Sequence, residues 1–149
     1  MRVGERYLIE ADIYEKLRSK ISSWPVRVPR SIELMEMLKI LYTPEEADLL
    51  TQFTAPYKNG QTTVQLAAKT GKPQEKVQAL IDHLVSRGLL FKYVSKKDKQ
   101  TYYTLMPLVP GIFEFYFSSG RDSDEKRKVA ELLERYFLNG FGMELGASD

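Results

Sequence analysis

Residues 62–105 read TTVQLAAKTGKPQEKVQALIDHLVSRGLLFKYVSKKDKQTYYTL, and this stretch decides the fold. Thr62 and Gln65 have the spacing of a capping box, in which each side chain bonds the backbone N–H of the other residue. This spacing predicts a short helix that runs through Lys69. Gly71 is placed to end that helix, because glycine takes the left-handed conformation at little cost.

A longer amphipathic helix is predicted over residues 73–87, with Gly88 as its terminator. Residues 89–94 and 101–105 then favour β-strands, and the charged turn 95–100 joins them into a hairpin. This order of elements predicts a winged helix-turn-helix in a mainly α chain: a short helix, a glycine turn, a long helix and a hairpin. The apolar residues of the long helix follow the i, i+3, i+4, i+7, i+8 spacing of one buried face: Val77, Leu80, Ile81, Leu84 and Val85.

Further helices are predicted on both sides of this unit. One covers about residues 5–21, and a second runs from a Ser31 cap to about Leu41. A third begins at Thr43 with a capping box to Glu46, and the last begins at Asp122 or Ser123. The apolar residues that we expect these helices to bury are, in chain order, Ile9, Ile13, Leu17 and Ile21; Ile32, Leu34, Met35, Met37, Leu38, Ile40 and Leu41; Ala47, Leu50 and Phe53; and Val129, Leu132, Leu133, Tyr136 and Phe137.

The chain divides into three parts at this level. Residues 1–30 form the N-terminal helix and a proline strap, residues 31–138 form the winged-helix domain with its C-terminal helices, and residues 139–149 form a tail or linker. In the strap, Trp24, Val26 and Val28 alternate with polar or proline positions. We expect them to pin the strap on the core, and a Trp-centred binding site is the alternative.

Composition excludes several classes of function. The 149 residues suit one domain, and a net charge of +2 is too small for a general polycation. The chain has no cysteine, so disulfides, thiolate metal sites and thiol catalysis are absent. We expect a cytoplasmic protein, because no signal-peptide core and no apolar run of membrane-spanning length occurs.

Charge is concentrated in residues 61–105, which we call the winged unit. It holds eight basic and three acidic residues, which give it a net charge of +5. Because the whole chain has a net charge of +2, the remaining residues carry a net charge of −3. Helix 73–87 and the wing 95–100 are therefore candidates for DNA contact, although Glu75 and Asp82 oppose phosphate. The alternative is a solvated helix face with ordinary surface lysines. The candidate DNA-binding residues are Lys72, Gln74, Lys76, Gln78, Lys96, Lys97 and Lys99.

Catalysis is not expected. His83 is the sole histidine and lies off the apolar stripe of its helix, so it should face solvent without a second nitrogen or sulfur ligand for a metal. No phosphate-binding glycine loop and no nucleophile constellation occurs.

Two apolar clusters lie beyond the winged unit. Residues 113–117 read FEFYF, and core packing of Phe113, Phe115, Tyr116 and Phe117 is the favoured interpretation, with a partner-facing patch as the alternative. In the tail, exposing large apolar side chains is unfavourable, so we expect them to dock on the aromatic cluster, a second copy or a downstream domain. These tail residues are Phe141, Met143 and Leu145.

Several segments, taken in order, resemble one protein family. The most specific is PLVPGIFEF at 107–115; the others are WPVRVP at 24–29 with Leu34 and Leu38, LYTPEEA at 41–47, YYTLM at 102–106, and YF at 136–137 with GFG at 140–142. They resemble the ferredoxin-like proteins of anaerobic bacteria and archaea that carry an N-terminal winged-helix domain before a 4Fe-4S dicluster domain.

The resemblance implies a non-catalytic accessory module of an iron–sulfur electron-transfer protein, which docks a redox partner or its own cluster domain. That family binds its clusters through motifs of the Cys-x-x-Cys-x-x-Cys-x-x-x-Cys-Pro type, and this chain has no cysteine. Either it is a fragment of a longer protein, which its ending suggests, or it is a stand-alone relative. We expect no cofactor in this chain and 4Fe-4S clusters only in a missing downstream domain. A DNA-binding transcriptional regulator is the alternative function.

Overall fold

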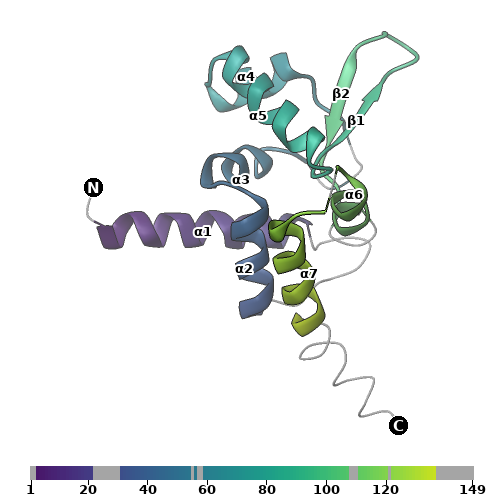
Figure 1. Ribbon diagram of the computed structural model, residues 1–149. Helices are drawn as coiled ribbons and strands as arrows, with labels where there is room; N and C mark the ends of the chain where they lie inside the picture. Colours follow the sequence, from purple (N-terminus) through teal and green to yellow (C-terminus); the bar gives the residue numbers. More distant parts are fainter. Residues whose placement is uncertain are drawn as a thin grey trace.

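The structure, a computed structural model, describes residues 3–21, 31–54, 56, 59–107, 111–120 and 122–136, and gives only the backbone of residues 3–11. The described chain is mainly helical, with one two-stranded antiparallel sheet, and it forms a winged helix-turn-helix with flanking helices, as the sequence predicts (Figure 1). The elements are α1 (Val3–Ile21), α2 (Ile32–Leu41), α3 (Pro44–Leu50), α4 (Thr63–Thr70), α5 (Gln74–Ser86), β1 (Phe91–Val94), β2 (Thr101–Thr104), α6 (Phe113–Ser118) and α7 (Asp124–Tyr136).

The helical body consists of α1, α2, α3, α6 and α7. Helices α2 and α7 pack side by side, and α1 packs against α2 and α3 (Figure 1). The Tyr14 hydroxyl of α1 donates a hydrogen bond of 2.6 Å to the carbonyl of Tyr42, which follows α2. One continuous apolar core extends from α1 to α7 and includes Leu17, Leu38, Leu84, Leu132 and Tyr136.

Local sequence sets the helix ends around the helix-turn-helix. Both predicted capping boxes are present: Thr43 with Glu46 opens α3, and Thr62 with Gln65 opens α4. Gly71 has φ +74° and its N–H bonds the Ala67 carbonyl, which ends α4 and turns the chain into α5.

The hairpin is joined to the segment before α4. In its register, Phe91 lies opposite Thr104 and Tyr93 opposite Tyr102. On the other side of β2, Gln61 and Tyr103 exchange two backbone hydrogen bonds of 2.9 Å. The base of the wing is therefore fixed, whereas its tip extends beyond the helices (Figure 1).

The winged unit, which contains α4, α5, β1 and β2, meets the body at the end of α5. Gly88 has φ +74°, and a Cβ at this position would lie 2.5 Å from the Phe115 carbonyl oxygen of α6. The Arg87 guanidinium donates to the Leu41 carbonyl at 2.5 Å and to the Glu125 carboxylate at 2.8 Å. The Ser119 hydroxyl donates to the Arg87 carbonyl at 3.0 Å.

Some of the predicted apolar faces are corrected by the structure. Ile32 is wrong as a core residue, since 76% of it is exposed. Residues are about 100° apart around a helix, so Ile32 lies on the side of α2 opposite Leu34 and Leu41. The FEFYF cluster divides: Phe113 and Tyr116 are buried, but Phe115 and Phe117 are 46% and 36% exposed. Core packing is therefore wrong for these last two.

Other predictions fall outside the described residues. These are the strap with Trp24, Val26 and Val28, the C-terminal Phe137, and the tail with Phe141, Met143 and Leu145.

Replacing the buried Leu84 by Ala should lower the free energy of unfolding by about 2–5 kcal/mol, because it removes core packing and leaves a cavity. Chemical denaturation measures this. Ile32→Ala is the control: it truncates an exposed side chain and should change stability by no more than about 0.5 kcal/mol. Equal losses in the two variants would mean that the inward face of α5 is misassigned.

Gly88→Ala should destabilise the protein more than Gly71→Ala. Both residues have positive φ, which costs a non-glycine residue about 1–2 kcal/mol. A Cβ at Gly71 would meet nothing within 4 Å apart from its chain neighbours, whereas one at Gly88 would meet the α6 backbone, which adds about 1–3 kcal/mol. Thermal and urea unfolding of both variants check the order, and equal losses would contradict the close approach of α6.

Candidate nucleic-acid interface

The wing tip carries the basic residues that the sequence analysis assigned to phosphate contact. Lys96, Lys97 and Lys99 lie in the turn between β1 and β2, and all are exposed. Lys92 of β1 is exposed as well. It belongs to the charge excess of the winged unit, although it was outside the predicted site.

Asp98 lies among these lysines, but its carboxylate bonds the turn itself. Oδ1 accepts a hydrogen bond of 3.0 Å from the Gln100 backbone N–H, and Oδ2 accepts one of 2.5 Å from the Tyr102 hydroxyl. The Tyr102 bond, followed by the Gln100 bond, lowers the pKa of Asp98 below its ordinary value. The same contact with Asp98 raises the pKa of Tyr102.

Five lysines of the winged unit differ from the other described basic residues in lacking a partner, whereas Lys69 and Lys76 of the same unit bond Gln52 and Glu45. Elsewhere, lysines and arginines pair with carboxylates, as Lys16 does with Asp12 and Arg135 with Glu131, or donate to carbonyls, as Lys20 does to Thr51. Among side chains that the structure describes, the lysine ammonium groups with no hydrogen-bonding, ionic or aromatic partner are those of Lys72, Lys92, Lys96, Lys97 and Lys99.

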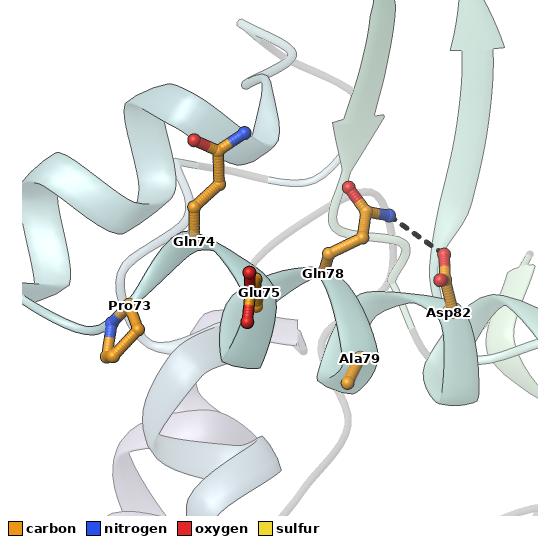
Figure 2. A pocket seen from close by; sticks show the side chains of 6 residues that line it. All are labelled: Pro73, Gln74, Glu75, Gln78, Ala79 and Asp82. Atoms are coloured by element: carbon orange, nitrogen blue, oxygen red, sulfur yellow. Dashed lines mark hydrogen bonds between the residues drawn. The ribbon is translucent and has the colours of Figure 1, made fainter.

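The exposed face of α5 has the opposite character. Pro73, Gln74, Glu75, Gln78, Ala79 and Asp82 line an open groove of about 790 Å³ along this helix (Figure 2). Its charged members are both acidic, so this face repels a phosphate backbone. Gln74 and Ala79 are its exposed neutral residues that could meet a base edge or a thymine methyl.

Gln78 is occupied by internal hydrogen bonds. Its amide oxygen accepts from the Thr63 hydroxyl at 2.6 Å, and its amide nitrogen donates to Asp82 at 2.8 Å and to the Tyr103 hydroxyl at 3.4 Å (Figure 2 shows the bond to Asp82). The side chain thus ties α4, α5 and β2 together. Base reading by Gln78 would require breaking these bonds.

Two further side chains of α5, Lys76 and His83, face carboxylates of α3. Lys76 Nζ lies 3.4 Å from Glu45 Oε1. His83 is 57% exposed, as expected for its position off the stripe, but its Nδ1 lies 2.7 Å from Oε2 of the buried Glu46. These contacts join positions far apart in the chain, so no local spacing could have indicated them.

In the residues that the structure describes, no group of three or more metal-ligating side chains could hold a metal ion. None of the described helices is long and apolar enough to cross a membrane.

Among known proteins, similarity to this chain is found at the level of solved structures. No protein-family model matches the sequence, and no curated protein matches it. A crystal structure of a MepR mutant from a multidrug-resistant S. aureus clinical isolate is similar at a TM-score of 0.31 and 13% sequence identity, over 100% of this chain and 85% of that chain.

Proposed function

We propose that this protein binds double-stranded DNA through a winged helix-turn-helix whose wing is the main phosphate contact. The observation that carries the proposal is the position of the lysines without partners. Lys92, Lys96, Lys97 and Lys99 lie on one hairpin, and Lys72 lies in the turn between α4 and α5. A cation that is not already paired can replace a counterion of the duplex, which is the main source of non-specific affinity.

The α5 face supports a limited role in base recognition. Major-groove reading by a helix-turn-helix requires its second helix to lie close to the phosphates that flank the groove. Here Glu75 and Asp82 oppose that approach, and Gln78 is bonded internally. We therefore expect affinity to come chiefly from the wing and discrimination between sequences to be modest.

The accessory role in an iron–sulfur protein remains a prediction from the family resemblance. Cluster ligands are cysteine thiolates in ferredoxin-type sites, and this chain has no cysteine. A cluster could therefore be held only by sequence outside this chain, and no described residue is assigned to one.

Replacing Lys96, Lys97 and Lys99 together by Ala should weaken binding to random duplexes at low salt. It should also flatten the dependence of log K on log salt by about 0.9 for each phosphate that the variant no longer neutralises. Fluorescence anisotropy with labelled duplexes at several salt concentrations measures both quantities.

The control variant changes Lys16, Lys39 and Lys128 to Ala, which removes the same charge from the exposed surfaces of α1, α2 and α7. It should leave the salt slope nearly unchanged. Equal weakening in both triple variants would mean that net charge, not the wing, drives binding. No binding by the native protein at micromolar concentration would rule out the proposed function.

A further inference from the structure

We propose that Asp98 and Tyr102 form a lock that holds the wing turn 95–100 in the conformation that presents Lys96, Lys97 and Lys99 to phosphate. An acidic residue in the centre of a basic wing then strengthens DNA binding instead of weakening it. This inference rests on the DNA-binding function proposed above and names the residues that position the lysines.

The Asp98 carboxylate is the centre of this lock. Both oxygens of Asp98 are used within the hairpin, one by the Gln100 N–H and the other by the Tyr102 hydroxyl. Two donors to one carboxylate compensate part of its charge and direct it toward the second strand. Each oxygen of this exposed carboxylate thus already accepts a hydrogen bond, which weakens its repulsion of an approaching phosphate.

The backbone that the lock holds includes an unfavourable conformation. Lys99 has φ +64°, a left-handed conformation that lysine adopts rarely. Its N–H bonds the Ser95 carbonyl at 2.9 Å, and the Ser95 N–H bonds the Gln100 carbonyl at 2.9 Å. Asp98 precedes Lys99 and accepts hydrogen bonds from Gln100 and Tyr102, which both follow it, so these bonds span Lys99. They compensate for the unfavourable backbone conformation.

Aromatic contacts attach the lock to the strands of the hairpin. Tyr102 lies opposite Tyr93 in the hairpin register, and their rings stack at a centroid distance of 5.7 Å and an interplanar angle of 16°. Tyr93 in turn contacts Phe91, with ring centroids 6.2 Å apart. The contacts among the rings of Phe91, Tyr93 and Tyr102 hold Tyr102 in place, and its hydroxyl orients the Asp98 carboxylate. Asp98 then holds the turn 95–100 through its bond from Gln100. Ordering a turn before binding reduces the entropic cost when the lysines engage their ligand.

For the removal of the Asp98 carboxylate, simple electrostatics and the proposed lock predict opposite changes in DNA affinity. Coulomb's law alone predicts that removing the Asp98 charge brings phosphate and lysines together more favourably, so binding should tighten. The lock predicts weaker binding when Asp98 is removed, because a disordered turn would then carry the three lysines. Tyr102→Phe separates the two effects, since it breaks the lock without any change of charge.

The experiment measures the affinity of Asp98→Ala and Tyr102→Phe for random duplex DNA at low salt by fluorescence anisotropy. Both variants should bind about twofold to tenfold more weakly than the native protein, the range expected when one or two hydrogen bonds are removed. Glu75→Gln is the charge-matched control on α5 and should bind at least as tightly as the native protein. Tyr93→Phe keeps its ring and should bind as the native protein does.

A second readout follows the turn without DNA. The heteronuclear NOE of the Lys97, Lys99 and Gln100 amides should fall in Asp98→Ala and Tyr102→Phe, and stay native in Glu75→Gln and Tyr93→Phe. Native NOE values in both lock variants would overturn the inference. So would native or tighter binding by Asp98→Ala in a protein whose native form binds. Failure of the native protein to bind any duplex would overturn the proposed function instead, and with it the role of the lock in presenting lysines.

Discussion

The close approach of α6 to Gly88 is the constraint on which the arrangement of this protein depends. A side chain there would meet the Phe115 backbone, so only glycine lets α5 end against the helical body. Arg87, one residue earlier, then reaches the Leu41 carbonyl and the Glu125 carboxylate, while its own carbonyl accepts from Ser119. Arg87 and Gly88 thus connect the winged unit to α2, α6 and α7, and these contacts set the position of the hairpin relative to the helical body.

Charge is segregated on this scaffold. At the junction and along α5, basic side chains pair with carboxylates of the helical body, as Arg87 does with Glu125 and Lys76 with Glu45. The wing lysines have no such partners in the described chain. Among the described residues, four of the five lysines without a partner lie on one projecting hairpin, so a net charge of +2 is compatible with the proposed polyanionic ligand.

The fold could be predicted from the sequence because its signals are local. Capping boxes at Thr43 and Thr62 and the left-handed Gly71 act over a few residues, and the apolar period of α5 is unambiguous. The site could be predicted only in part. The lysines of the tip are visible as a charge cluster, but the hydrogen bonds of Gln78 and the pairing of His83 with Glu46 depend on tertiary contacts between distant segments. Asp98 enters the sequence analysis only as one of the three acidic residues of the winged unit, because a sequence does not show that its oxygens face Gln100 and Tyr102.

The hairpin also has an open edge. Strand β1 pairs with β2 on one side, and in the described part of the chain no strand covers its other side. Tyr93 and Val94 are 38% and 58% exposed, so this edge offers backbone groups and apolar side chains to a second hairpin. Lysines on an edge strand oppose such pairing through like-charge repulsion, and Lys92 lies on β1 itself. The wing charges thus also protect against aggregation, and selection for solubility alone would retain some of them.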